Sequence, residues 1–183
     1  MDDVVGVIKA QHRTIDRLLD KAMAQDGDVH ALLQQVADLL IPHSEAEESF
    51  VYPSIKAHQP DEGEEVKDGV AEHHHIEGTL RELLQEDPDG PGFDGKLAAL
   101  VGELRHHVEE EEEDLLPVLE SEASDEERAE LGTRFARETH WAKDTSSDDR
   151  TKAELYEAAS EQDVAGRSSM SKEELAAAVD DEG

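Results

Sequence analysis

The chain of 183 residues has room for one domain and a short appendage, and 36% hydrophobic residues suffice for the core of a helical bundle. Asp and Glu outnumber Lys and Arg by 48 to 17, and the resulting net charge of −31 repels nucleic acid and anionic membranes. Because the sequence contains no Cys, disulfides, thiolate zinc sites and iron–sulfur clusters are excluded, whereas His and carboxylate side chains remain as metal ligands.

The sequence contains no long apolar run and no signal-like N-terminus, so we expect a cytoplasmic protein. Its acidity favours solubility and attracts cations. Two explanations of the acidity stay open: a high-salt cytoplasm, in which surface carboxylates keep proteins hydrated, or simply the solvated outer faces of helices.

The first helix is expected from about Asp2 to Ala24. Apolar residues recur in it at intervals of three and four, which is the spacing of a buried stripe, and His12 stands on that stripe. Taken alone, His12 is best explained as a core or boundary residue that is hydrogen-bonded to a neighbour.

A second helix is expected to begin near Asp28 and carries His43 and Glu47 on its apolar stripe. A carboxylate at a position where packing favours an apolar residue needs a partner, because burying an unpaired charge is costly. Pro42 lies within this pattern and should kink the helix or loosen one turn, and Pro53 marks a second bend or the approach to the helix end.

A loop is expected over 58–65, and the third helix that follows carries His73 and Glu77 four residues apart on its apolar stripe. His74 and His75 point elsewhere on this helix. We expect both to be solvated, with His74 as the second choice of ligand if the register slips.

The segment 86–95 is dense in Pro, Gly and Asp and separates the third helix from a fourth that begins near Phe93. The stripe of the fourth helix contains His107 and Glu111. It thereby selects one acid from the run Glu109 to Asp114, and the other acids of that run are expected to form a solvated face.

A capping box of Ser124 and Glu127 predicts a fifth, shorter helix, whose Leu131 and Phe135 should pack back on the bundle. We place the bundle domain at 1–139. A linker rich in Ser and Asp follows at 140–150.

The tail, 151–183, has two further capping boxes around a break, which predicts two short helices joined by an extended turn. It resembles the helix-extended-helix motif of the Rho termination factor N-terminal and SAP-like families, which often bind nucleic acid. The tail, however, has three basic residues against nine acidic ones, and neutralising phosphates needs the opposite balance. We therefore favour a protein partner over DNA, with Arg167 and Lys172 as the only candidate phosphate contacts.

The most informative feature is an internal repeat. HSEAEESFVYP, which starts at His43, and HVEEEEEDLLP, which starts at His107, both have a His, a Glu pair four and five residues later, and a Pro ten residues later. Residues i and i+4 lie on one face of a helix, so each His can bind the same metal ion as Glu47 or Glu111.

A weaker echo relates QHRTIDRLL, around His12, to EHHHIEGTL, around His73. The order of the four motifs predicts two similar helical hairpins, each of which supplies a His from its first helix and a His plus a Glu from its second. Such hairpins would form a pseudo-twofold bundle around a dinuclear site. An acidic structural bundle without metal would have to bury several unpaired ionisable groups, so the metal site is favoured.

Ferritin-like bundles place a His three residues after a Glu, whereas here a Glu follows a His by four residues, so that pattern does not fit. The motifs instead resemble the hemerythrin family, in its broad HHE cation-binding branch, over about Met1 to Leu119. The resemblance rests on the lone His of the first helix, HxxxEE with YP in the second, EH in the third and HxxxEE with LP in the fourth.

This resemblance implies an all-α, up-down-up-down four-helix bundle that holds a non-haem di-iron centre, with Glu47 and Glu111 as bridges between the two Fe ions. His12 and His43 would serve one iron, and His73 and His107 the other. Imidazole and carboxylate suit Fe(II) and Fe(III). Asp16 and Glu77 are optional further ligands by their i+4 spacing. The candidate metal ligands are thus His12, His43, Glu47, His73, Glu77, His107 and Glu111.

Oxygen-carrying hemerythrins have a fifth His four residues after the His of the third helix, and this chain has Glu77 there. They also have an Asp five residues after the His of the fourth helix, whereas this chain has Glu111 four residues after that His. Added carboxylate charge stabilises Fe(III), which favours reaction with oxygen or peroxide, sensing, or iron handling over reversible oxygen carriage. We expect a protein that binds or senses oxygen, peroxide or nitric oxide and signals through its tail. The alternatives are a di-iron enzyme that decomposes peroxide or acts as an oxidase, and an interaction protein without metal.

Overall fold

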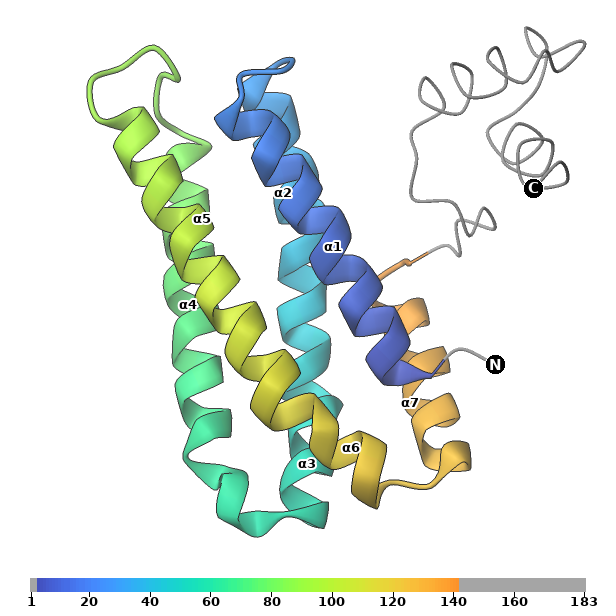
Figure 1. The fold of residues 1–183 in the computed structure, drawn as a ribbon. Helices are drawn as coiled ribbons and strands as arrows, with labels where there is room; N and C mark the ends of the chain where they lie inside the picture. The colour runs from blue at the N-terminus through green and yellow to red at the C-terminus, as the bar shows by residue number, and fades with distance from the viewer. Residues whose placement is uncertain (1–2, 142–183) are drawn as a thin grey trace, which may run out of the picture. The chain divides into compact units, whose positions relative to one another are not determined.

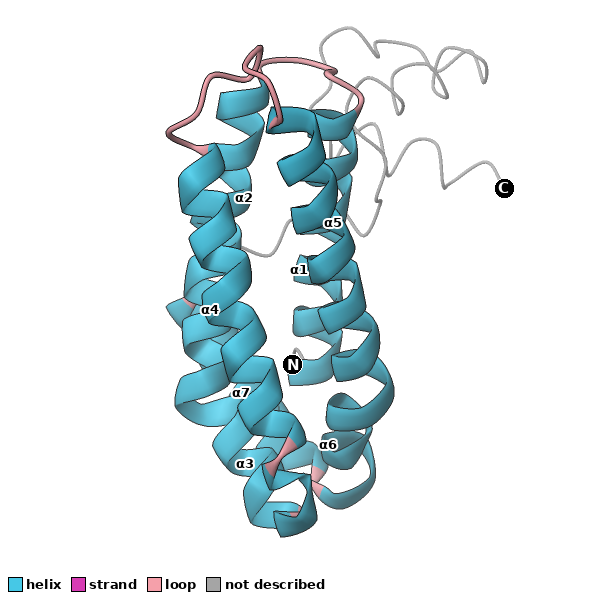
Figure 2. Ribbon diagram, turned by 90° about the vertical axis from the view of Figure 1, so that its left-hand side faces the viewer, coloured by secondary structure: helices cyan, strands magenta, loops and turns pink. Residues whose placement is uncertain are grey.

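The computed structural model describes residues 3–141, which form helices joined by turns and loops, with no strand within that range (Figure 2). Four long helices lie side by side and alternate in direction (Figure 1). They are α1 (Val4–Met23), α2 (Val29–Ala46), α4 (Glu65–Leu83) and α5 (Phe93–Glu110). The expected all-α helical bundle is confirmed. The remainder of the predicted linker and the tail motif at 151–183 lie outside the described residues.

Short polar side chains determine where three helices begin, since each accepts a hydrogen bond from a backbone N–H of the first turn that has no partner within the helix. These cap residues are Asp3 for α1, Asp28 for α2 and Ser124 for α7 (Asp125–Glu138). At α5 the preceding residue is Gly92, whose φ of 94° is a conformation that glycine adopts without strain.

Two π-helical turns follow α2 and α5 at the same point of the internal repeat. They are η1 (Glu47–Val51), which leads into α3 (Tyr52–His58), and η3 (Glu111–Leu115), which leads into α6 (Leu116–Glu122). In each turn the carbonyl of the Glu accepts from the N–H five residues on, at Tyr52 and Leu116.

Each π turn is followed directly by a proline at the second position of the next helix. Proline has no N–H and its ring crowds the preceding turn, and a widened turn accommodates both effects. The loosened turns therefore lie at Glu47 and Glu111. At Pro42, where we expected a kink or a loosened turn, α2 continues as an α-helix to Ala46.

The apolar core consists of two clusters of buried side chains, one at each end of the bundle. One cluster contains Ile8, Phe50 and Leu119, and the other contains Ile15, Leu80 and Leu100. The candidate ligands fall between the two clusters along all four long helices. The bundle thus holds a layer of ionisable side chains between two apolar layers.

Helix α7 packs against α1 and α2, and the expected packing of Leu131 and Phe135 on the bundle is confirmed. Phe135 is fully buried and meets the ring of Phe50 edge to face at 6.2 Å, and the Arg134 guanidinium lies 4.0 Å from the centre of the same Phe50 ring. A fifth helix therefore covers one side of the four-helix bundle.

Only half of the expected capping box at the start of α7 is present. Ser124 Oγ accepts from the Glu127 N–H at 3.2 Å, but the Glu127 carboxylate does not reach back to the cap. It accepts from Ser54 Oγ at 2.9 Å and pairs with His58 Nε2 at 3.0 Å. This carboxylate therefore joins α7 to α3.

The remaining element of the described part is a 3₁₀ turn, η2 (Pro60–Gly63), within the expected loop. None of the helices in residues 3–141 has both the length and the apolar character needed to span a membrane.

Deleting the chain after Arg150 should leave the thermal unfolding midpoint of the bundle unchanged, because the caps and core contacts described above are made within residues 3–141. Circular dichroism on the full-length and shortened proteins provides the measurement. A shortened protein that no longer unfolds cooperatively would show that the domain boundary is drawn too early.

Candidate metal centre

Six of the predicted ligands lie in the polar layer of the bundle and are almost fully buried. They are His12 in α1, His43 and Glu47 at the end of α2, His73 in α4, and His107 and Glu111 at the end of α5. Each is at most 5% exposed. Helical spacing explains the arrangement, since each residue occupies the core-facing stripe of its helix.

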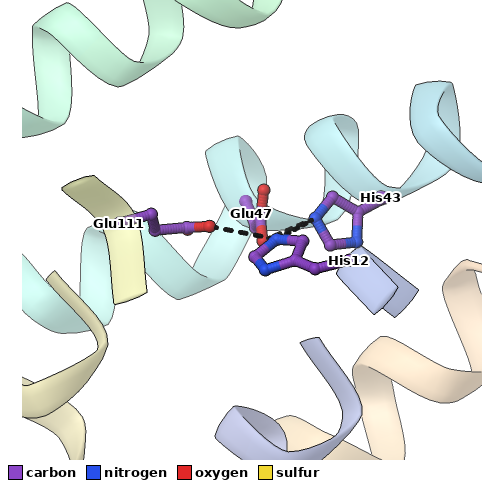
Figure 3. Close-up of side chains that lie close together, drawn as sticks. All are labelled: His12, His43, Glu47 and Glu111. Carbon is purple, nitrogen blue, oxygen red and sulfur yellow. Dashed lines mark hydrogen bonds and ion pairs between the residues drawn. The ribbon is translucent and has the colours of Figure 1, made fainter. Parts of the chain in front are cut away.

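The first group of ligand atoms comes from His12, His43, Glu47 and Glu111, and all of these atoms lie within 4.8 Å of one another. Figure 3 shows the four side chains converging from three directions. His43 Nε2 lies 3.0 Å from Glu47 Oε1, and His12 Nε2 lies 3.3 Å from Glu111 Oε2. The two imidazoles approach each other to 3.1 Å between their Nε2 atoms.

The second group comes from Glu47, His73 and His107, again with ligand atoms within 4.8 Å of one another. His73 Nε2 lies 2.9 Å from His107 Nε2 and 3.3 Å from Glu47 Oε2. One oxygen of Glu47 thus faces His43 and the other faces His73. The Glu47 carboxylate spans both groups, as a bridging ligand must.

Every one of the four imidazoles turns Nε2 inward and places Nδ1 against an oxygen acceptor. The pairs are His12 with Glu112 at 2.8 Å, His43 with Gln11 at 3.0 Å, His73 with Glu48 at 3.1 Å and His107 with Glu72 at 2.9 Å. Acceptors of this kind orient the imidazole, fix its tautomer and make Nε2 a stronger ligand.

A chain of hydrogen bonds determines the tautomer of neutral His43. Thr139 Oγ donates to the Phe135 carbonyl, which can only accept, so the same Oγ accepts from the amide Nε2 of Gln11 at 2.8 Å. Gln11 Oε1 is then the acceptor that faces His43, and His43 Nδ1 must be the donor. The lone pair of neutral His43 therefore points into the centre.

The same reasoning leaves lone pairs on the inward atoms of all four imidazoles when they are neutral. The Nε2 lone pairs of His12 and His43 would then face each other across 3.1 Å, and those of His73 and His107 across 2.9 Å. Each approach is repulsive unless a cation lies beside it. In addition, all four carboxylate oxygens of Glu47 and Glu111 are buried without a hydrogen-bond partner among residues 3–141, because the nearby His contacts lack hydrogen-bond geometry. The donor set thus fits metal ions, since cations satisfy both the oxygens and the imidazoles.

Without a metal, protons supply the positive charge at this site. Burial lowers the pKa of His12, but the adjacent carboxylates of Glu111 and Glu112 outweigh burial and raise the pKa to about 10. For His73, burial likewise lowers the pKa and Glu47 raises it, to about 9. Metal binding must displace such protons, so the affinity for metal falls as the pH falls.

Burial raises the pKa of Glu47, but the adjacent imidazoles of His43 and His73 outweigh burial and hold that pKa well below its usual range. Burial and the carboxylates of Glu111 and Glu47 raise the pKa of Tyr52 well above its usual range, so the phenol keeps its proton. The Tyr52 ring stacks on His73, with Oη 3.4 Å from His73 Nε2.

The two optional ligands lie outside both groups. Glu77 is 8% exposed and pairs with Arg81 at 2.7 Å, and Asp16 pairs with Arg105 at 2.7 Å on the surface. His74 and His75 are largely exposed, as expected.

The acceptors behind the imidazoles were not identified by sequence reasoning, which assigned Glu112 to the solvated face. A usable signal was present: Glu48 and Glu112 are the second Glu of each duplicated pair, and Gln11 and Glu72 each precede the His of a first helix. Repetition of a polar residue at equivalent positions indicates a shared contact.

The fold and this ligand arrangement define a helical bundle with a buried cation site, and comparison with known proteins supplies the family. The family model for the hemerythrin HHE cation binding domain matches residues 3–119, which include all six clustered ligands. The chain belongs to the hemerythrin HHE cation-binding family. The resemblance inferred from the motifs is thereby confirmed.

Similar curated proteins differ in how much of their length the chain covers. An uncharacterised hemerythrin-like protein of Schizosaccharomyces pombe is 30% identical over 54% of this chain and 49% of its own length. A protein of Nostoc named DNA nickase is 23% identical over 73% of this chain but only 38% of that protein. An uncharacterised protein of Mycobacterium tuberculosis is 25% identical over 71% of this chain and 81% of its own length. No solved structure matches the chain.

Replacing Glu112 with Ala should lower the affinity for a divalent metal about 10- to 100-fold, because His12 loses the acceptor that orients it. Glu113→Ala removes the same charge from the neighbouring, exposed position and should leave the affinity near that of the wild type. Titration with Co(II) against a competing chelator measures both. Equal affinities for the two variants would contradict the role assigned to Glu112.

Proposed function

We propose that this chain is a non-haem di-iron protein that binds or senses oxygen or a related small molecule, such as peroxide or nitric oxide. The observation that supports this most is the carboxylate of Glu47, whose two oxygens face two separate pairs of imidazoles. Such an arrangement suits two ions held side by side.

In this proposal each ion has a pair of His ligands and shares Glu47 with the other ion. The pairs are His12 with His43 and His73 with His107, and Glu111 is the second bridge. Two Fe ions with this mixed imidazole and carboxylate set would supply one-electron redox chemistry at open coordination positions. Glu77 is left out of the ligand set, because Arg81 holds its carboxylate.

A small cavity of about 10 Å³ borders all four imidazoles and is the proposed site of the small molecule. Its other walls are the apolar side chains Ile15, Leu40, Leu104 and Val108. A volume near that of a single water probe restricts the ligand to a few atoms, and apolar walls favour an uncharged one. Oxygen, peroxide and nitric oxide meet both conditions.

Tyr52 favours the second candidate function, a di-iron enzyme that decomposes peroxide or acts as an oxidase. Its buried phenol keeps a proton next to His73 Nε2. A phenol that stays protonated can donate a hydrogen bond to a peroxide oxygen at the centre and so stabilise charge that develops as the O–O bond breaks, which a turnover reaction would use. Catalytic consumption of peroxide would identify an enzyme, and reaction once per centre would identify a sensor.

The tail remains a proposed docking segment for a protein partner rather than for nucleic acid, in view of its acidic composition. The cytoplasm remains the proposed compartment.

The full-length protein, produced in the presence of iron, should retain two iron atoms per chain. His73→Ala should lose iron because it removes a proposed ligand, while His74→Ala changes the exposed neighbour and should retain both atoms. Metal analysis of the three purified proteins measures this. One tightly held zinc per chain with no iron would contradict the proposal.

Glu77→His should slow air oxidation of the reduced centre, since Glu77 carries negative charge that favours the more positive, oxidised state. Arg81→Gln should act in the opposite direction, because it leaves the Glu77 charge without its ion-pair partner. The rate is read from the iron absorption spectrum after anaerobic reduction and exposure to air. If neither variant changes the rate, Glu77 does not set the redox chemistry.

A further inference from the structure

A second, larger cavity of about 120 Å³ reaches the centre between α4 and η3. Its inner wall includes His107 and Glu111, and its outer part is lined by the carboxylates of Glu65, Asp68 and Asp114. No Lys or Arg of residues 3–141 lines it. The cavity thus has ligand atoms at its inner end and negative charge at its mouth.

The Glu111 side chain indicates that this cavity can bind a cation and does not hold solvent alone. Glu111 is 1% exposed, lines the cavity, and has two oxygens without a hydrogen-bond partner. At the mouth, Glu65, Asp68 and Asp114 are exposed, and none of them has an ion-pair partner within residues 3–141. Their charge is therefore uncompensated.

The internal repeat provides a comparison for these acids. In the first half of the repeat, the positions equivalent to Glu65, Asp68 and Asp114 are occupied by three buried apolar residues. These are Val4, Val7 and Phe50. Phe135 of α7 packs in the same cluster and covers them. One of two related faces is thus apolar and closed by α7, while the other is acidic and open.

Two further features favour the acidic cavity as the route for an ion. Gly69 lines the cavity and has no side chain to narrow it, and a Cβ there would meet Tyr52 Oη at 3.1 Å. The cavity on the imidazole side is smaller and largely apolar, and a charged ion that crosses apolar walls loses its hydration at a high cost.

We propose that the acidic cavity between α4 and η3 is the passage through which a hydrated divalent cation reaches the centre, and that its mouth carboxylates bind the ion before the inner ligands do. Carboxylates attract cations over several ångströms and replace water ligands one at a time. Glu111 then receives the ion at the inner end. This inference rests on the proposed dinuclear centre and adds a route to it.

The test measures the rate at which the metal-free, full-length protein takes up Co(II), followed by stopped-flow visible absorption. The mouth variant carries Glu65→Gln, Asp68→Asn and Asp114→Asn, and should load about tenfold more slowly than the wild type. Its final Co(II) content should equal that of the wild type, because none of the three is a ligand of the centre. Added salt should slow the wild type more than the mouth variant, since salt screens the attraction.

A matched control carries Glu109→Gln, Glu113→Gln and Asp94→Asn, three exposed acids that do not line the cavity. It changes the net charge by the same amount and should load at nearly the wild-type rate. Equal rates for the mouth variant and the control would overturn the passage while leaving the centre intact. A mouth variant that binds less Co(II) at equilibrium would also overturn it, because the mouth acids would then be ligands. Absence of Co(II) binding by the wild type would overturn the centre itself, and the passage with it.

Discussion

The structure depends on the burial of two carboxylates and four imidazoles in one layer of a helical bundle. Each buried carboxylate costs several kcal/mol unless it is paired. Within residues 3–141, the nearby groups are imidazoles whose outer nitrogens already face acceptors and the protonated phenol of Tyr52, so positive charge must come from protons or from metal ions. The apolar clusters above and below close this layer at both ends. The stability of the fold therefore depends on the positive charge that the cation site receives.

Duplication of a helical hairpin explains the geometry of the centre. His12 and His73, and likewise His43 and His107, occupy equivalent positions, and each half supplies the outer acceptor for an imidazole of the other half, as Glu112 does for His12. The halves differ where α7 packs. Gln11 stands where the second half has Glu72, and Thr139 at the end of α7 orients it. The two proposed metal positions thus have unequal charge behind their imidazoles.

The sequence predicts the bundle and the six clustered residues well because both depend on helical periodicity: an ionisable residue on an apolar stripe must face the core. Contacts that depend on side-chain direction were beyond this reasoning. Glu77 shares the stripe of His73, yet it turns to Arg81, and Glu127 turns from its cap to His58. A kink or loosened turn was likewise expected at Pro42, whereas the widened turn lies at Glu47, just before Pro53, where a second bend or the helix end was expected. The proline pattern alone does not say which neighbouring turn adjusts.

Iron K-edge X-ray absorption on the iron-loaded protein can show whether the buried carboxylate layer holds two ions side by side, because scattering from a second iron gives the separation of the two ions. We expect an iron–iron distance of up to about 4 Å, within the range of two-metal sites, and loss of that scattering in Glu47→Ala. A spectrum explained by isolated iron with only nitrogen, oxygen and carbon neighbours would rule out the paired ions.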